Sequence, residues 1–290
     1  MKPEVAVDRS CLLGEGPLWH VADRALYWLD YMRGEIYRFE PDSGAHEVVY
    51  SGPRVSGFTL QADGGLLLLI EGARVAIWRE GSVEILIDGF PGSEGMHFND
   101  AATDPQGRVF TGTVADAPDR YEDRVGTLYR IDVDARITPL IEGIGISNGI
   151  GFSPSCDRIY TTDTLSRRIH AFDYDVHTGE LANPRVFVET PPHEGGPDGL
   201  TVDREGYVWS ARWEGSAIYR YAPDGREDLR IGFPVKKITS LTFGGPDLRD
   251  LYVTSGGGDD RKTEGALAGA LFRIEGDIEG RPPYLSCIGL

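Results

Sequence analysis

The chain of 290 residues has only three cysteines, Cys11, Cys156 and Cys287. Their odd number and wide spacing argue against a disulfide framework or a cysteine-rich metal site, and predict buried thiols in a reducing compartment. Basic residues are also scarce, because 29 Lys and Arg stand against 46 Asp and Glu and give a formal net charge of −17. Nucleic acids and anionic membrane surfaces both require Lys and Arg patches, so we expect neither as a partner.

Long hydrophobic runs and helical periodicity are missing too. Residues 1–8 lack the apolar core of a signal peptide, and the run from Leu66 to Ile70 is far too short to cross a bilayer. The sequence therefore predicts a cytoplasmic protein, which we expect to be a monomer or a weak homo-oligomer. No segment between the predicted strands repeats apolar residues at helical spacing, which argues against a parallel α/β fold.

What the sequence does contain is one pattern written six times. Each copy has a polar residue at the head of a short alternating strand, then a turn, then a second strand, most clearly in residues 196–210. The six heads are Glu15, Ser56, Asn99, Asn148, Asp198 and Ser240. Neighbouring heads are about 41 to 50 residues apart, a period typical of propellers and similar arrays.

A third strand follows in most copies, as in residues 218–221, and a weaker fourth in several, as in residues 83–87. Four antiparallel strands in each of six units predict an all-β fold, a six-bladed β-propeller around a central channel. No linker interrupts the repeat, so we expect residues 1–290 to form a single domain. An open propeller would leave unpaired edges, and we therefore expect Glu4–Val7 to complete the last blade beside Tyr284–Cys287.

The six polar heads are expected to share one mouth of the channel, because the innermost strands of a propeller line it. One Glu, one Asp and two Asn offer hard oxygen donors, which suit Ca²⁺, Mg²⁺ or Mn²⁺ better than a soft ion. Two carboxylates that face one buried axis would repel each other without a cation. The alternative is that each head merely caps the start of its strand, as Asn, Asp and Ser often do in turns.

Five motifs, in this order, resemble the regucalcin/gluconolactonase (senescence marker protein-30-like) family: residues 13–19, 98–100, 147–149, 197–199 and 243–248. Some other stretches look closest to bacterial aldonolactonases. The resemblance covers essentially the whole chain and implies a six-bladed propeller that hydrolyses sugar lactones with one catalytic divalent ion (Ca²⁺, Zn²⁺, Mn²⁺, Mg²⁺ or Fe²⁺). It also implies that Glu15, Asn148 and Asp198 ligate the metal and that Asn99 touches metal-bound water or substrate.

The chain departs from the family pattern at two positions. Many members have Arg two residues before the Asn at position 99, where this chain has His97, and a sugar-binding carboxylate falls near Ala117, beside Asp116. His97 and Asp116 are therefore predicted to bind substrate, with a surface turn histidine as the alternative for His97. Both differences concern substrate binding, and the predicted metal ligands are unchanged.

Lactone hydrolysis requires an electrophile at the carbonyl oxygen and a deprotonated water, and a divalent ion can help with both. Asp198, ligating through one oxygen, would take the water proton with the other and is the predicted general base. Two alternatives stay open: a metal-dependent hydrolase of aryl esters or phosphotriesters, and a non-catalytic calcium-binding regulatory propeller. Residues 145–149 fit G-x-S-x-G, but a strand is predicted where a nucleophile elbow needs a helix, so we attribute the match to chance.

Overall fold

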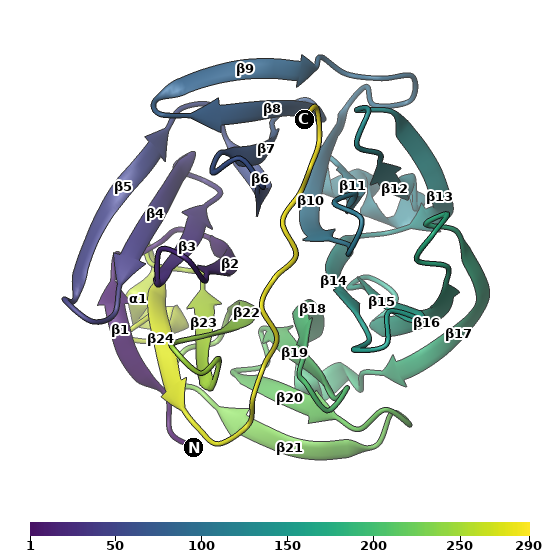
Figure 1. The fold of residues 1–290 in the computed structure, drawn as a ribbon. Helices are drawn as coiled ribbons and strands as arrows, with labels where there is room; N and C mark the ends of the chain where they lie inside the picture. The colour runs from purple at the N-terminus through teal and green to yellow at the C-terminus, as the bar shows by residue number, and fades with distance from the viewer. The chain divides into compact units, whose positions relative to one another are not determined.

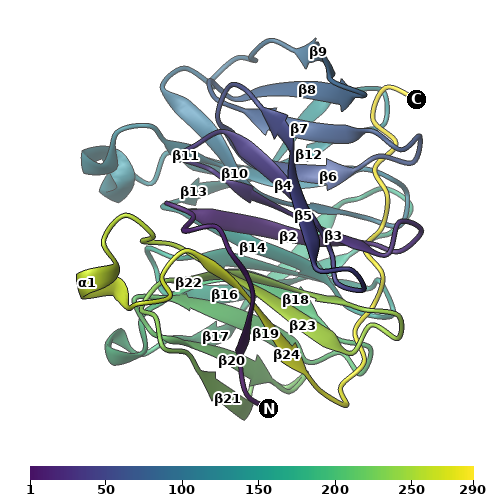
Figure 2. The same ribbon diagram turned by 90° about the vertical axis from the view of Figure 1, so that its left-hand side faces the viewer.

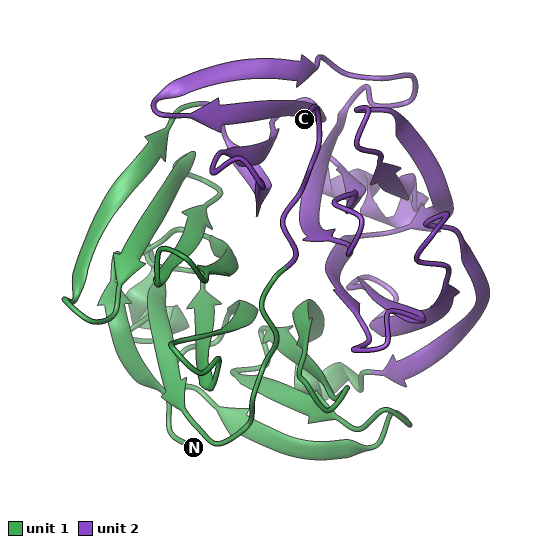
Figure 3. Cartoon of the chain, in the orientation of Figure 1, with its two compact units in different colours: residues 1–52, 190–283 green, residues 53–189, 284–290 purple.

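The computed structural model describes residues 1–290 and is nearly all β. Its strands form six four-stranded antiparallel sheets, in five of which four consecutive strands pair in chain order. This is a six-bladed β-propeller fold, as the sequence predicts (Figure 1). The chain divides into two compact units, residues 1–52 with 190–283 and residues 53–189 with 284–290 (Figure 3). The single domain stays a prediction.

Unit 1 (residues 1–52 and 190–283) holds three sheets. They contain β2 (Gly14–His20), β3 (Ala25–Asp30), β4 (Glu35–Glu40) and β5 (Ala45–Ser51); β18 (Gly196–Val202), β19 (Val208–Trp213), β20 (Ala217–Tyr221) and β21 (Glu227–Gly232); and β22 (Ile238–Gly244), β23 (Asp250–Ser255) and β24 (Ala270–Glu275) with β1 (Glu4–Asp8). The short helices are η2 (Pro192–Glu194) and α1 (Arg261–Glu264). Figure 2 shows α1 at one end of this unit and the chain that follows β24 at the other.

Unit 2 (residues 53–189 and 284–290) holds the other three sheets. They contain β6 (Val55–Leu60), β7 (Leu66–Ile70), β8 (Arg74–Arg79) and β9 (Ser82–Ile87); β10 (Met96–Thr103), β11 (Val109–Ala115), β12 (Gly126–Ile131) and β13 (Ile137–Ile144); and β14 (Ser147–Phe152), β15 (Arg158–Asp163), β16 (Arg168–Tyr174) and β17 (Leu181–Glu189). The 3-10 helix η1 (Pro118–Asp123) follows β11.

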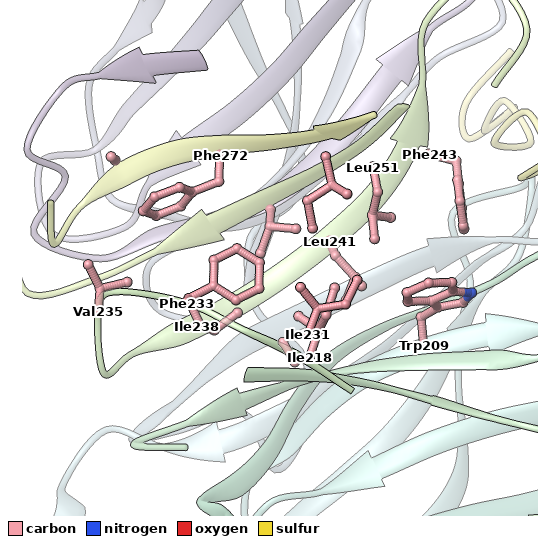
Figure 4. Close-up of a cluster of buried hydrophobic side chains, with 14 of the residues drawn as sticks. Trp209, Ile218, Ile231, Phe233, Val235, Ile238, Leu241, Phe243, Leu251 and Phe272 are labelled. Carbon is pink, nitrogen blue, oxygen red and sulfur yellow. The ribbon is translucent and has the colours of Figure 1, made fainter. Parts of the chain in front are cut away.

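Apolar side chains fill the space between neighbouring sheets within each unit. In unit 1, Trp209 of β19 meets the ring of Phe243 of β22 edge-on, with centroids 5.7 Å apart, and Phe233 meets Phe272 in the same way at 5.4 Å (Figure 4). Such T-shaped pairs add to the area buried, because the positive ring edge faces the negative ring face. The apolar residues of the predicted strands therefore form the core between neighbouring sheets.

The N-terminal strand completes the last blade, but with a different partner from the one expected. β1 pairs with β24, in a register that places Glu4 opposite Arg273. The prediction that Tyr284–Cys287 lies beside it is wrong, because this segment forms no strand in that sheet. Pro282 and Pro283 precede the segment and supply no N–H for a ladder.

The C-terminal segment is instead bound within unit 2. The N–H of Ser286 donates to the carbonyl of Leu60 over 2.8 Å. The Gln61 side chain donates to the carbonyl of Ile288 over 2.9 Å and accepts from the N–H of the same residue over 3.2 Å. These bonds hold the last residues against the turn that follows β6.

The three cysteines are free, so the prediction of no disulfide is confirmed. Cys11 is buried, and burial raises the pKa of its thiol to about 12. Cys156 and Cys287 are partly exposed, so the expectation of buried thiols holds for Cys11 alone. The helices are all too short and polar to span a membrane.

A fully buried carboxylate stabilises the turn between β18 and β19. Asp203 accepts from the backbone N–H of Glu205 and Tyr207, from the indole of Trp209 over 3.0 Å, and from the Arg220 guanidinium over 2.7 Å. Charge-assisted bonds of this kind are stronger than neutral ones. The Asp-x-x-Gly turn of the sequence repeat thus also carries an ion pair that anchors β20.

Asp203→Ala is expected to lower the free energy of unfolding by about 3–5 kcal/mol, because it leaves the charge of Arg220 buried with less compensation. Denaturant titration followed by circular dichroism measures this change. Asp224→Ala is the matched control, since Asp224 is an exposed turn residue paired only with Arg226 and should cost less than about 0.5 kcal/mol. An equal decrease in the free energy of unfolding of the two variants would show that the buried hydrogen bonds of Asp203 stabilise the fold no more than an exposed ion pair does.

Candidate active site

The first strand of every sheet has a register shift at its head. In unit 1 the shifts fall between Glu15 and Leu18, Pro197 and Leu200, and Ile238 and Leu241; in unit 2 they fall between Val55 and Gly57, Phe98 and Ala101, and Asn148 and Ile150. All six predicted heads lie within or directly at these β-bulges. Bulges re-aim side chains and are common beside active sites. The polar column of the sequence therefore coincides with a local distortion shared by all six blades.

In unit 1 the heads of three neighbouring first strands lie close together. The Thr239 hydroxyl of β22 donates to the carbonyl of Gly14 in β2 over 2.6 Å. On the other side of β22, a Cβ on Gly199 would come within 2.3 Å of the Ser240 Oγ, so only glycine fits this approach. Glu15 follows Gly14 directly, and Asp198 precedes Gly199 directly.

Exposure differs between the two carboxylates of unit 1. Asp198 is only 3% exposed, whereas Glu15 is partly exposed. Burying a carboxylate is costly unless partners or a cation compensate its charge. The burial of Asp198 is in keeping with its predicted role as a metal ligand, and the strand cap stays the alternative.

In unit 2 the two predicted asparagines are hydrogen-bonded to each other. The Asn99 Nδ2 donates to the Asn148 Oδ1 over 2.9 Å and to the carbonyl of Ser147 over 2.7 Å. The Asn148 Nδ2 in turn donates to the Thr164 Oγ1 over 3.0 Å. These bonds orient both amides, and a carbonyl oxygen that accepts one bond keeps a second lone pair for another partner.

His97 and Asp116 are also brought together in unit 2. The His97 Nδ1 lies 2.9 Å from the Asp116 Oδ1. His97 belongs to β10, so its interpretation as a turn residue is wrong. Side chains alternate along a regular strand, and since Phe98 is buried in the apolar core, its neighbour His97 is on the other face. Asn99 lies in the bulge that follows Phe98.

Two residues near the heads need separate mention. Asp163 accepts from the backbone N–H of Ile146 and from Arg124 over 2.9 Å, so its charge is already paired. Asp100, for which the sequence pattern predicts no role, lies beside Asn99 in the same bulge. Burial raises the pKa of the Asp100 carboxyl to about 6. Its position next to a predicted site residue was the one signal that could have singled it out.

The predicted ligands fit a hard divalent cation by their chemistry. No group of three or more His, Cys, Asp or Glu side chains is arranged to hold a metal. The predicted set consists of the carboxylates of Glu15 and Asp198 and the amide of Asn148. Carboxylate and amide oxygens suit ions such as Ca²⁺ and Mg²⁺, and the Asn148 nitrogen is already committed to Thr164.

Comparison with known proteins decides the family. The family model described as "SMP-30/Gluconolactonase/LRE-like region" matches residues 13–257. The chain belongs to this family. The resemblance inferred from the five motifs is thereby confirmed for the greater part of the sequence.

Relatives of this SMP-30/gluconolactonase family protein match it over nearly its whole length. Pentonolactonase XacC of Haloferax volcanii is 41% identical over 296 residues, covering 98% of each chain. Regucalcin of Bos taurus is 33% identical over 293 residues, again covering 98% of each chain. Among solved structures, the calcium-binding protein regucalcin of Agrobacterium tumefaciens is 27% identical with a TM-score of 0.88, covering 97% of this chain and 96% of that one.

Proposed function

We propose that the protein is a sugar lactonase that hydrolyses aldonolactones to aldonic acids and uses one divalent metal ion. The observation that carries the proposal is the position of Glu15, Asn148 and Asp198. The family resemblance implies that each is a metal ligand, and each lies at the bulge of a first strand. The full-length similarity to a pentonolactonase supports a lactone as the substrate.

In this proposal Glu15, Asn148 and Asp198 hold the ion. When bound, the ion supplies an electrophile for the carbonyl oxygen and lowers the pKa of a water molecule. Asp198 accepts the proton of the attacking water at a carboxylate oxygen, and its burial limits competition from bulk solvent. The similarity to a calcium-binding regucalcin makes Ca²⁺ the first ion to test.

Asn99 acts in two ways. Its Nδ2 holds the Asn148 amide in the orientation that leaves the oxygen available. Its Oδ1 takes no part in these bonds and would accept a hydrogen bond from the substrate or from water. This orienting function is proposed in addition to the contact that the family resemblance implies.

His97 of β10 and Asp116, whose side chains lie 2.9 Å apart, would together bind a sugar hydroxyl group. We expect His97→Ala to raise KM about five- to tenfold and to change kcat less than about threefold, because one hydrogen bond to the substrate is worth about 1–1.5 kcal/mol. Steady-state kinetics on the preferred lactone measure both constants. His193→Ala is the control, since that side chain is 82% exposed. A fall in kcat at constant KM would contradict a binding role.

The substrate class is tested by proton release in weakly buffered solution. Fresh pentono- and hexonolactones, an aryl acetate and a phosphotriester would be compared with the metal-loaded protein. The proposal predicts that lactones open far faster than the blank and that the other esters do not. Faster turnover of the aryl ester or phosphotriester would favour the alternative hydrolase, and metal binding without any hydrolysis would favour a regulatory calcium-binding protein.

The cytoplasmic location, the monomeric or weakly oligomeric state and the absence of nucleic-acid and membrane partners stay predictions.

A further inference from the structure

A second candidate site lies within unit 2, and none of the six polar heads lines it. A cavity of about 520 Å³ opens between the sheet of β10–β13 and the sheet of β14–β17. Ligand pockets in proteins are typically of this size. None of the residues assigned to the lactonase site lines it.

One wall of the cavity is apolar. It is formed by Leu140 and Ile144 of β13 and by Phe172 and Leu181 of β16 and β17. These side chains belong to the apolar cluster that packs the two sheets against each other. The cavity therefore lies at the edge of this apolar core, where polar side chains begin to line it.

The other wall carries polar groups that lack partners. Thr161 and His170 are directly opposite each other in the β15–β16 ladder, and neither side chain makes a hydrogen bond. The Nε of Arg168, two residues before His170, is buried and also has no partner. Buried polar groups in native proteins are nearly always satisfied, and an unsatisfied one costs about 1–3 kcal/mol. The Nε of Arg168 and the Oγ1 of Thr162, which also lines the cavity, are two such buried atoms. With the side chains of Thr161 and His170 they point to a ligand that supplies the missing bonds.

Both arginines that line the cavity are already paired, and the remaining lining carboxylate, Glu142, is exposed. Arg124 lies 2.9 Å from Asp163, and Arg168 lies 3.3 Å from Glu189. Burial lowers the pKa of His170, so near neutral pH its ring is uncharged and offers one donor and one acceptor. An anionic ligand would find no unpaired cation here, whereas a neutral ligand with hydroxyl groups matches the donors and acceptors of the wall.

We propose that this cavity binds a small neutral polyhydroxylated molecule, of the size and chemistry of a pentose, with its hydroxyl groups on Thr161, His170 and Arg168 and its C–H face on Phe172 and Leu181. The assignment does not depend on the proposed lactonase function. It concerns a different part of the chain, and the probe used to test it contains no lactone.

The test is calorimetric titration of the full-length, metal-loaded protein with methyl β-D-xylopyranoside. Thr161→Val and His170→Phe are each expected to weaken binding about tenfold, the equivalent of one lost hydrogen bond of about 1.4 kcal/mol. Leu140→Trp fills the cavity from its apolar wall and should abolish binding. Thr103→Val, a buried threonine of unit 2 that does not line the cavity, should bind like the wild type.

The Asp198→Asn variant separates the two sites. Unchanged binding of the xyloside to this variant, together with weaker binding of the acid D-glucuronate and the cation D-glucosamine, would support the proposal. Binding that is lost in Asp198→Asn but kept in Leu140→Trp would place the sugar at the lactonase site and overturn it. Absence of heat up to millimolar concentrations, or tighter binding of either charged sugar, would overturn it as well.

Discussion

Asp198→Asn is expected to reduce kcat for lactone hydrolysis by about 10²–10⁴-fold, the usual contribution of a positioned general base. The amide has nearly the same shape as the carboxylate but cannot take a proton from water. The substitution also removes one negative charge from the predicted metal ligands, so the apparent affinity of the protein for the metal should fall. Initial rates of proton release at saturating lactone and saturating metal separate the two effects.

Asp224→Asn is the matched control for this substitution. It makes the same chemical change in unit 1, at an exposed turn residue of the β20–β21 connection. Circular dichroism should show that both variants keep the β-sheet spectrum of the wild type. If Asp198→Asn retained more than about a tenth of wild-type kcat, another group would have to be the base, and Asp100 would be the next candidate to test.

Removal of the metal is expected to have the second large effect. Treatment with a chelator followed by desalting should lower the rate to that of the blank, and one divalent ion should restore it. The physical reason is that neither Asn148 nor Asn99 can polarise a carbonyl oxygen as a cation does. Rates before stripping, after stripping and after adding back Ca²⁺, Zn²⁺, Mn²⁺, Mg²⁺ or Fe²⁺ rank the ions.

Ligand variants connect that loss to particular side chains. Glu15→Gln and Asn148→Ala should each weaken metal binding at least about tenfold. Ser56→Ala alters another strand head without removing a predicted ligand, and should bind metal like the wild type. An ion that binds equally well to all three variants would occupy some other site.

The sequence predicted those features that repeat. The six blades, their boundaries and their polar heads follow from one local pattern of alternating strands and Asp-Gly turns, because each copy confirms the others. The closing strand β1 could be expected from the need to pair an edge, and it is found on the outer side of β24. The bulges at the heads were not predicted, since a register shift depends on both strands of a pair.

The parts that could not be predicted depend on contacts between distant residues. The docking of the C-terminal segment depends on Gln61, which lies 227 residues from its partner Ile288 and carries no local signal. The bond between Asn99 and Asn148 joins two sheets, so it could not be read from either repeat alone. The buried pair of Asp203 and Arg220 looks in sequence like an ordinary turn and a surface charge.

The most direct test of the account is to measure bound metal and lactone hydrolysis in the same titration. Metal-stripped protein would receive increasing amounts of Ca²⁺, or of the ion that restores most activity, while bound ion and proton release from the preferred aldonolactone are recorded together. Activity is expected to rise in proportion to the bound ion and to reach its plateau at one ion per chain. Full activity before any metal is bound, or saturation of the site with no lactone opened, would contradict it.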